Sequence, residues 1–574
     1  EGFELAFPDS PFVNEPVFAV SGSVAGLIET ARQAGIHLGV DVSGRLSGDA
    51  RQLLKLSFSD READLEALAA FLDGNGFQRS AEEPPVAAEI PAAQLRSGKL
   101  GLPEMEDDAI VAYYRSLGDL NVSPDDACYP LGSCTMKYNP KVHEELAAEP
   151  GFADLHPYAP EEFSQGALGL MYDLQHVLAE IAGFKGIALQ PAAGAHGELT
   201  GVLMIRAYHR ARGDTARTKV LVPDSAHGTN PATVAMAGLE VVEIPSDREG
   251  NADLEAIRAN LGPDVAGIMI TNPNTLGLFE RNIADICRMV HEAGGLVYGD
   301  GANLNAILGV LRPGDVGIDV MHFNLHKTFS TPHGGGGPGA GAVGAGERLV
   351  EFLPGPVVAL RGDVEGAAGP SAGGGAGSAS TAAGAAGGGP GAAGGAVPTG
   401  RYTWRMPAHS IGRLKAFHGN FGMFVRALAY ILAHGRDGLP TVAENAVMNA
   451  NYLRVTLRDT YHVKYDRTCM HEFVAQGDVT DGIHTMDIAK RLLDYGIHAP
   501  TVYFPLIVKE ALMIEPTETE SKQTLDAFIG AMEEIAREAR QAPEALHQAP
   551  HTMPLKRLDE VAAARKPVVR YCPS

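Results

Sequence analysis

Between about residue 160 and residue 350 the sequence alternates short apolar runs with amphipathic helical patterns, and this alternation restricts the chain to few folds. The apolar runs have the length of buried strands and read KVLVP, LEVVEI, AGIMIT and GLVYGD. Between them, DLEAIRANL and ADICRMVHEAGG show helical spacing. The pattern favours an α/β fold with a doubly wound, mostly parallel sheet covered on both faces. In such sheets, ligands bind beyond the carboxyl ends of the strands.

Composition and pattern divide the chain into five regions. Residues 1–85 predict a small α/β unit in which SVAGLIETARQAG is a helix capped by Ser23 and ended by Gly35. In the same unit LLKLSF is a strand, and DREADLEALAAFL is a second helix whose inward face includes Leu65 and Leu72. We expect the rest to comprise an N-terminal arm with a substrate-side loop at 86–159, a large domain at 160–355, a Gly/Ala-rich flexible linker at 356–400, and a smaller C-terminal α+β domain at 401–574.

Charge and cysteine content exclude several classes of protein. The formal net charge is -24 and no Lys/Arg-rich run occurs, which argues against nucleic acid or a membrane surface as a partner. No apolar stretch approaches the roughly 20 residues of a membrane helix. The five cysteines form no CxxC pair, so neither a disulfide framework nor a zinc site is predicted. A reducing compartment is expected, either the cytoplasm or, in a eukaryote, the mitochondrial matrix.

Polar residues follow four of the predicted strands. After IALQ, the segment PAAGAHGE opens a helix whose free amides, from Ala193 to Ala195, suit a phosphate. His227, Asn272 and Asp300 follow the next strands, and Lys327 lies 27 residues beyond Asp300. Each feature alone is equally typical of a cap or a turn. Together they match the needs of a phosphorylated pyridine aldehyde: an anion cradle, a flat stacking group, a carboxylate for the ring nitrogen and an amine for the aldehyde.

Longer motifs make the chain recognisable. It resembles the P-protein of the glycine cleavage system, the pyridoxal-phosphate glycine decarboxylase, in YPLGSCTMKYNP, QPAAGAHGELTG, DSAHGTNPATVAMAG, TNPNTLGLFE, DGANLNAILG and NLHKTFSTPHGGGGPGAG. The similarity continues through SIGRLKAFHGNFG, CMHEFV and EPTETESK, and covers roughly residue 100 onward. It fits the catalytic second half of the family, also found as a separate subunit 2. Residues 1–85 resemble, more faintly, the end of the first half.

The resemblance implies fold type I of the pyridoxal-phosphate enzymes and a role for each matching residue. Lys327 is the implied Schiff-base lysine, Asp300 the partner of the pyridine nitrogen, and His227 the stacking group. His326 is expected to touch the cofactor or the substrate carboxylate. The remaining implied contacts are Ala193, Gly194 and Ala195 with the phosphate, Asn272 and Ala302 with the cofactor, and Ser133, Cys134 and Thr135 in the substrate-side loop.

The resemblance also implies a reaction and its partners. Glycine would lose CO2, and its aminomethyl group would pass to the lipoyl arm of a carrier, the H-protein. The chain would work as a homodimer or as a heterotetramer with a first-half P-protein subunit. No metal is expected, and we expect Cys134 to pack rather than to react.

Three alternatives remain open at this stage. The chain could be a pyridoxal-phosphate decarboxylase or aminotransferase for another amino acid, or a non-catalytic partner subunit that keeps the fold. His322 and His326, four residues apart, could bind a metal, although pyridoxal chemistry explains His326 better. Gly334 to Gly337 could form a plain surface turn, whereas we expect the bare backbone to approach the cofactor and a neighbouring subunit.

Overall fold

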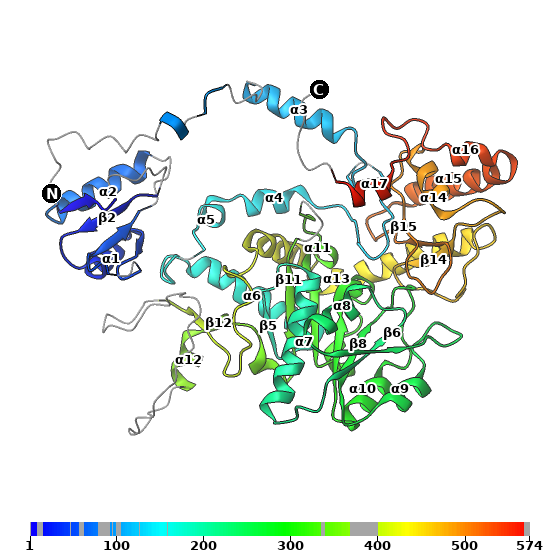
Figure 1. Cartoon of the computed structure of the whole chain (residues 1–574), viewed down its shortest axis with the longest axis horizontal. Helices are drawn as coiled ribbons and strands as arrows, with labels where there is room; N and C mark the ends of the chain where they lie inside the picture. Colours follow the sequence, from blue (N-terminus) through cyan, green and yellow to red (C-terminus); the bar gives the residue numbers. More distant parts are fainter. Residues whose placement is uncertain are drawn as a thin grey trace. The chain divides into compact units, whose positions relative to one another are not determined.

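The computed structural model describes residues 2–7, 15–45, 48–56, 62–77, 92–94, 96–98, 105–125, 127–157, 159–334, 339–367 and 400–567. The chain forms two compact units, 1–116 and 117–574, and each is described by itself (Figure 1). The expectation for the tetraglycine falls largely on Gly335 to Gly337, outside the described residues, as does most of the Gly/Ala tract, 368–399. Within the described ranges, no helix combines the length and the apolar character needed to cross a membrane.

The first unit is a small antiparallel sheet with two helices. Its strands are ordered β1-β2-β4-β3. Helix α1 begins and ends as predicted, because the Ser23 hydroxyl accepts the Gly26 amide (3.1 Å) and Gly35 adopts a φ of +78°. The prediction for Leu65 was wrong: it is 44% exposed, and Phe71 is buried in its place. The elements are β1 (Phe3–Leu5), β2 (Val17–Val20), α1 (Val24–Gln33), β3 (Val40–Asp41), β4 (Leu53–Lys55), α2 (Glu62–Gly74) and η1 (Ala92–Gln94), and α3 (Asp107–Gly118) crosses the boundary between the units.

The second unit is built on a seven-stranded sheet of order β5-β11-β10-β9-β8-β6-β7. Strands β10, β9, β8, β6 and β7 run parallel, and β11 is antiparallel to both β10 and β5. The four predicted strands are present to within one residue, and β8 is buried along its whole length. The strands are β5 (Gly186–Ala188), β6 (Lys219–Pro223), β7 (Glu240–Ile244), β8 (Val265–Thr271), β9 (Leu296–Asp300), β10 (Val320–Asn324) and β11 (Gly341–Ala345).

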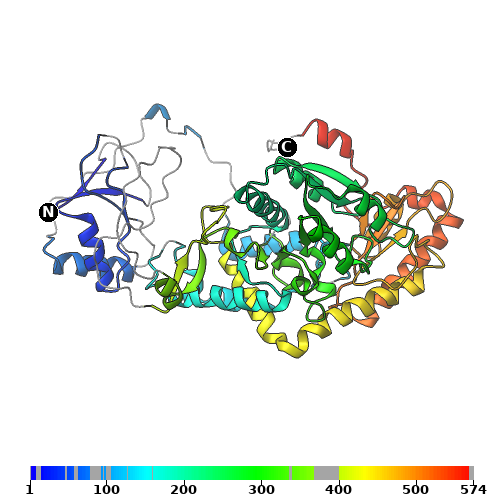
Figure 2. The same ribbon diagram turned by 90° about the horizontal axis from the view of Figure 1, so that it is seen from below.

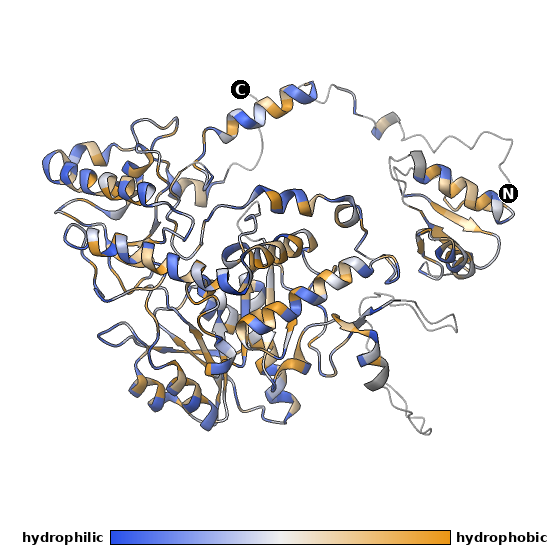
Figure 3. Cartoon of the chain, turned by 180° about the vertical axis from the view of Figure 1, so that it is seen from behind, coloured by the Kyte–Doolittle hydropathy of each residue, from blue (hydrophilic) through white to orange (hydrophobic). Residues whose placement is uncertain are grey.

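Helices cover both faces of this sheet, whose strands are largely apolar (Figure 3). One face packs against α7 (Gly194–Ala211) and α8 (Thr229–Met236). The other packs against α6 (Gln165–Ala182), α9 (Leu254–Asn260), α10 (Ile283–Glu292) and the first part of α13 (Phe421–Leu457). Helix α7 lies close to the strands because Gly197 and Gly201 face them: a Cβ would come within 2.6 Å of His322 Cβ and 2.5 Å of the Tyr298 ring, respectively.

The small lobe, which we define as residues 471–547, follows α13. Helix α13 bends at Gly435, where φ is +62°, and its second part joins the core of the small lobe (yellow in Figure 2). The three antiparallel strands are ordered β14-β16-β15. The elements of the small lobe are β14 (Phe473–Gln476), α14 (Thr485–Leu493), β15 (Thr501–Val502), β16 (Ala511–Ile514), α15 (Lys522–Gln541) and α16 (Pro543–His547).

The arm, residues 127–140, runs along an edge of the small lobe. Leu131 forms an isolated antiparallel bridge with Ile514, and the His498 amide donates to the carbonyl of Cys128 (3.3 Å). The arm thereby extends the sheet next to β16. The remaining elements of this unit are α4 (Lys141–Ala147), α5 (Pro150–Ala153), η2 (Gly301–Ala306), η3 (Pro313–Val316), α11 (Leu325–Thr328), η4 (Val350–Phe352), β12 (Val357–Leu360), α12 (Arg361–Ala367), β13 (Tyr402–Arg405) and α17 (Glu560–Arg565).

Candidate active site

The carboxyl ends of the parallel strands bring Asp300 and Lys327 into one site. Strand β9 ends at Asp300, opposite Thr271 at the end of β8. Strand β10 ends at Asn324 and continues directly into α11, which carries Lys327. Asp300 is buried, Lys327 is half-buried, and the two are close enough that Lys327 lowers the pKa of Asp300. Sheet topology therefore brings together two residues that are 27 positions apart in the sequence.

Asp300 is held as a carboxylate. It accepts hydrogen bonds from the Asn230 amide group (3.1 Å) and the Ala302 backbone (2.9 Å), and His322 Nε2 lies 3.6 Å away. Burial raises the pKa of Asp300, but His322, the two hydrogen bonds and Lys327 outweigh this and hold the pKa below its ordinary value. A buried carboxylate that stays ionised suits a protonated ring nitrogen.

A chain of buried polar groups lies behind Asp300. The Tyr298 hydroxyl lies 2.5 Å from His322 Nδ1, and His322 Nε2 lies 2.6 Å from Asn324 Oδ1. Asn324 Nδ2 then lies 3.4 Å from His326 Nε2. These supporting groups were not predicted. The available signal was polar residues at alternating positions of a buried strand, since His322 and Asn324 point to the same face of β10.

The start of α7 suits an anion. Its N-cap, Ala193, is extended and provides no side-chain cap, so the first amides of an 18-residue helix stay available. A Cβ on Gly194 would come within 2.5 Å of Asn324 Nδ2, so glycine lets the helix start at the end of β10. Burial lowers the pKa of His196, and Lys415 lies near enough to lower it further. These features fit the phosphate expected at Ala193, Gly194 and Ala195.

His227 lies on the accessible side of the site. Its side chain is exposed, with Nδ1 2.9 Å from the Thr229 hydroxyl and the ring centroid 5.5 Å from that of Phe504. Thr229 is held in turn by Glu198, whose carboxylate also accepts from Asn230 (2.8 and 2.9 Å). The loop after β6 thus presents an imidazole with an open face, as ring stacking requires.

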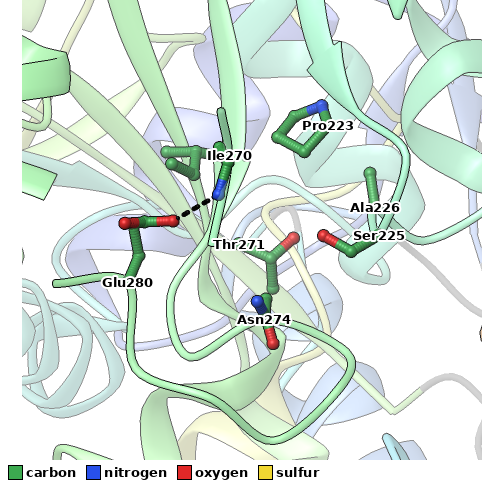
Figure 4. A pocket seen from close by; sticks show the side chains of 8 residues that line it. Pro223, Ser225, Ala226, Ile270, Thr271, Asn274 and Glu280 are labelled. Carbon is green, nitrogen blue, oxygen red and sulfur yellow. Dashed lines mark hydrogen bonds between the residues drawn. The ribbon is translucent and has the colours of Figure 1, made fainter. Parts of the chain in front are cut away.

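Asn272 is already partly engaged by the protein, because its Oδ1 accepts the Glu280 amide at 3.0 Å. Beside it, a small pocket opens between the ends of β6 and β8 (Figure 4). Figure 4 shows the hydroxyls of Thr271 and Ser225 facing each other across this pocket, and Thr271 Oγ1 is buried without a partner in the described chain. The Asn272 amide nitrogen and the second acceptor position of its Oδ1 stay available for the predicted cofactor contact.

His326 is a neutral imidazole. Its Nδ1 lies 3.0 Å from the Ala340 carbonyl, and its ring packs edge-on against His333 with centroids 4.9 Å apart. Burial, followed by the charges of His333 and Lys327, lowers the pKa of His326 to about 3. The residue next to Lys327 therefore carries no charge at neutral pH.

The predicted substrate-side loop faces Lys327 from the arm. Ser133 and Thr135 have positive φ values of 60° and 46°, and both amides donate to buried glutamates of the small lobe. Ser133 donates to Glu472 Oε2 at 2.8 Å, and Thr135 to Glu515 Oε2 at 3.1 Å through its amide and to Oε1 at 2.6 Å through its hydroxyl. Burial raises the pKa of the half-buried Cys134, and Lys327 offsets this only in part.

These two glutamates form a buried cluster with His471. All three side chains have 0% exposure, and His471 Nε2 lies 4.0 Å from Glu472 Oε1 and 3.9 Å from Glu515 Oε1. Lys327 affects the pKa of each member, which locates the cluster at the same site. No role was predicted for these three residues, because nothing in CMHEFV or EPTETESK distinguishes them from ordinary polar residues at the ends of strands.

Lys137 joins the arm to both domains and was also missed. Its Nζ is 2.6 Å from Glu518 Oε1, 2.9 Å from Asn305 Oδ1 and 2.8 Å from the Thr328 carbonyl, next to Lys327. The Tyr430 hydroxyl is a fourth partner at 3.2 Å. A lysine that is 3% exposed with four partners fixes the arm against the segment that carries Lys327.

Comparison with known families identifies matches along most of the chain. Residues 111–370 match the family model "Glycine cleavage system P-protein", and residues 442–557 match "Glycine dehydrogenase, C-terminal domain". The chain is 52% identical over 494 residues to a probable glycine dehydrogenase (decarboxylating) subunit 2 from Caldanaerobacter subterraneus, covering 85% of this chain and 94% of the relative. A relative of the same description from Desulforamulus reducens is 53% identical over 489 residues, covering 84% and 93%.

Solved structures share the fold. A glycine decarboxylase (P-protein) of the glycine cleavage system, in inhibitor-bound form, matches with a TM-score of 0.62 at 22% identity, covering 84% of this chain and 100% of that chain. A cysteine desulfurase from Thermococcus onnurineus matches with a TM-score of 0.52 at 16% identity, covering 73% and 98%. A glutamate decarboxylase from Lactobacillus brevis matches with a TM-score of 0.56 at 12% identity, covering 78% and 96%. The expected α/β fold, type I of the pyridoxal-phosphate enzymes, is confirmed.

Proposed function

Because the chain belongs to the family of glycine dehydrogenase (decarboxylating) subunit 2, the P-protein of the glycine cleavage system, we propose that it decarboxylates glycine with the help of pyridoxal 5'-phosphate. CO2 is released, and the aminomethyl group passes to the lipoyl arm of the H-protein. The lipoyl disulfide is reduced in this step, which makes the enzyme an oxidoreductase of glycine catabolism.

The observation that carries the proposal is an ionised, buried Asp300 beneath an accessible face that also holds Lys327. Pyridoxal 5'-phosphate, when bound, supplies a ring that takes up the electron pair left by the departing CO2. In this assignment Asp300 keeps the ring nitrogen protonated, Lys327 holds the aldehyde carbon, and His227 stacks on the ring. The amides from Ala193 to Ala195 hold the phosphate, and the Ala302 backbone orients Asp300 (2.9 Å).

The substrate side of the site is assigned to the arm. Ser133, Cys134 and Thr135 face Lys327 from across the site and are held in a fixed shape by two buried glutamates. We assign this loop to contacts with glycine and with the incoming lipoyl arm. His326, neutral and bonded through both ring nitrogens, packs against the site without adding charge.

A partner subunit is also part of the proposal. The relatives are described as subunit 2, which implies a subunit 1. We propose a heterotetramer with that first-half subunit, with a homodimer of this chain as the alternative. Native mass spectrometry of the chain alone and after addition of a first-half subunit distinguishes the two assemblies.

The function is tested by CO2 release from labelled glycine, with and without lipoylated carrier. Lys327→Ala is expected to abolish release and to remove the visible absorbance of cofactor-loaded protein, and borohydride trapping is expected to tag Lys327. Asp300→Asn is expected to lower the rate on the order of 10²–10³-fold, because the ring loses its electrostatic partner.

The matched control for Asp300 is Asp319, a buried aspartate at the opposite end of the sheet that also pairs with a histidine (His291, 2.7 Å). Asp319→Asn is expected to leave the rate per loaded enzyme unchanged. Wild-type rates in Asp300→Asn, or a borohydride tag at another lysine, would contradict the assignment.

A further inference from the structure

We propose that the buried pair Glu472 and Glu515, with His471 beside it, holds the proton that the leaving sulfur of the lipoyl disulfide receives during aminomethyl transfer. This inference rests on the proposed function and assigns a role that the reaction requires. The pair hydrogen-bonds the arm loop and is close enough to Lys327 for this lysine to lower the pKa of both glutamates, so it belongs to the site where the carbon and the disulfide would meet.

The hydrogen bonding of the cluster is incomplete in a way that suits a shared proton. Glu472 Oε2 and both oxygens of Glu515 accept from the arm loop, which fixes the two carboxyl groups. In the described part of the chain, Glu472 Oε1 and both ring nitrogens of His471 have no partner. Buried polar atoms without partners are costly and are concentrated at functional sites. The loop that contacts the pair is itself partly accessible, since Ser133 and Cys134 are half-buried.

The charges around the pair favour keeping one proton. Lys327 faces it from α11, Cys134 from the arm, and Glu518 from the segment after β16. Two adjacent buried carboxyl groups do not both ionise readily. Burial and then Glu515 raise the pKa of Glu472 well above its ordinary value, and burial raises the pKa of Glu515 to about 7 despite the Thr135 bonds and Lys327.

Other described groups that face Lys327 are poor donors of this proton at neutral pH. Burial lowers the pKa of His326 and His471 to about 3 and that of His333 to about 4, so the three imidazoles are neutral. Asp300 is ionised. The Cys134 thiol has a raised pKa and is a weaker acid than the ordinary thiol it would have to protonate. Among these described groups, only the glutamate pair combines a retained proton with sufficient acidity.

The step balances in atoms and electrons. The electron pair freed when CO2 departs forms the bond between the aminomethyl carbon and one sulfur. The S–S bond breaks with its electrons on the second sulfur, which takes the proton from the glutamate pair and becomes a thiol. Solvent returns one proton to the pair. The disulfide is reduced by two electrons, and the glycine carbon is oxidised by two.

The experiment compares Glu472→Gln and Glu515→Gln with the matched control Glu520→Gln. Glu520 is a half-buried glutamate whose pKa burial also raises to about 7, and it accepts a backbone bond from the arm at Tyr129, but Lys327 is not among the groups that shift its pKa. Aminomethyl transfer is followed by the mass of the lipoylated carrier between pH 6 and 9. The glycine-induced change in the visible spectrum of cofactor-loaded enzyme reports the steps before transfer.

We expect Glu472→Gln and Glu515→Gln to lower transfer about 100-fold, the usual range for loss of a general acid, with an unchanged spectral response to glycine. Wild-type transfer should fall as pH rises above about 7, because Glu515 ionises there and leaves only Glu472, the weaker acid of the pair, and this limb should be absent in Glu515→Gln. Glu520→Gln should behave as wild type.

Transfer in the two Gln variants equal to that in Glu520→Gln would overturn the proposal. Should a Gln variant fold poorly, Glu515→Asp keeps an acid and is expected to retain the pH limb. Infrared difference spectra of the wild type between pH 6 and 9 give a readout without the carrier, and absence of a protonated carboxyl band that Glu515→Gln removes would also overturn the proposal. A wild type that does not respond to glycine would overturn the proposed function itself.

Discussion

The first unit and the small lobe contain the same module, but the carboxylates at its strand ends have different environments. Leaving β1 aside, each copy runs strand, helix, short strand, strand, helix, and in each the last of the three strands lies between the other two, with all pairings antiparallel. In each, the first helix is followed by Gly-Ile-His, at residues 35–37 and 496–498. Both glycines have positive φ values, +78° and +70°.

The strand register aligns the two copies residue by residue. Lys55 pairs with one residue on each side, Val17 and Val40, and Met513 pairs in the same way with Val474 and Thr501. Position 55 of the first unit therefore corresponds to position 513 of the small lobe, which also aligns position 15 with 472 and 57 with 515.

A glutamate at the same position of the module is exposed in one copy and buried in the other. Glu15, in the position of Glu472, is 55% exposed and pairs with Lys55 at 3.0 Å, whereas Glu472 is fully buried against the arm. The residue in the position of Glu515 is Ser57. Register and the glycine turn are common to both copies and specify the module. The segment that packs against the strand ends of the module determines whether a carboxylate there is an exposed surface charge or a buried group of the proposed site.

The largest expected contrast is between Lys137, the arm lysine that pairs with Glu518 of the small lobe, and Lys55 of the first unit. Lys137→Met leaves Glu518 buried without its ion-pair partner and should cost about 3–5 kcal/mol of unfolding free energy. Lys55→Met breaks only the exposed pair with Glu15 and should cost less than about 1 kcal/mol. Denaturation followed by the fluorescence of Trp404, the single tryptophan, reports the second unit, and hydrogen exchange reports the first.

Equal losses of unfolding free energy in the two units would contradict this prediction, because the expected difference comes from the burial of one ion pair and not from its charge. Lys137→Arg serves as the conservative control. The Lys137 ammonium group has four partners, and a guanidinium group has a different geometry. Lys137→Arg should therefore recover only part of the lost unfolding free energy.

A second contrast is the pH dependence of stability. The pKa of Glu515 is raised from 4.5 to about 7 in the folded chain, so the folded state binds more protons than the unfolded state between these values. The contribution of Glu515 is present below about pH 4.5 and is lost as pH rises to about 7, by on the order of 3 kcal/mol. Glu515→Gln should flatten this slope in urea titrations of the second unit.

The counterpart in the first unit is Glu15→Gln, which alters a side chain that is 55% exposed. It should leave the pH slope of that unit unchanged in hydrogen-exchange measurements. A steeper slope in Glu515→Gln than in wild type would contradict the assigned burial of a protonated carboxyl.

The smallest effect should be the same in both copies. Gly35→Ala and Gly496→Ala each force a side chain into the left-handed region, at positions where a Cβ meets no atom within 4 Å. Both helices end with the same bond, Ile36 to Ala31 and Ile497 to Leu492. Each substitution should cost about 1–2 kcal/mol. A difference well beyond this range between the two would show that the copies differ locally, despite their common register.

Local patterns accounted for much of the fold. The apolar runs of β6, β8 and β9 became strands because continuous burial leaves little choice of structure for such segments, whereas the run of β7 became an edge strand in which Ile244 is the buried residue. The ends of α1 were predictable because Ser23 and Gly35 act on neighbouring backbone. Asp300 and Lys327 could be paired in advance because the carboxyl ends of parallel strands meet at one edge.

Residues whose environment comes from distant segments could not be predicted. Leu65 has helical spacing, but no element among the described residues covers it, and its side chain is 44% exposed. Glu472 and Glu515 look like ordinary glutamates at strand ends until the arm, more than 300 residues earlier in the chain, covers them. Lys137 likewise reads as a surface lysine, since nothing within its own motif indicates four partners from elsewhere.

The partners of Lys137 also set an order of events during synthesis. Asn305 emerges from the ribosome 168 residues after this lysine, Tyr430 293 residues after it, and Glu518 381 residues after it. A nascent chain that stops short of Glu518 has already made the whole seven-stranded sheet but still lacks the counter-ion of the arm lysine. The segment carrying Lys327 can therefore be locked in place only after Glu518 has been synthesised.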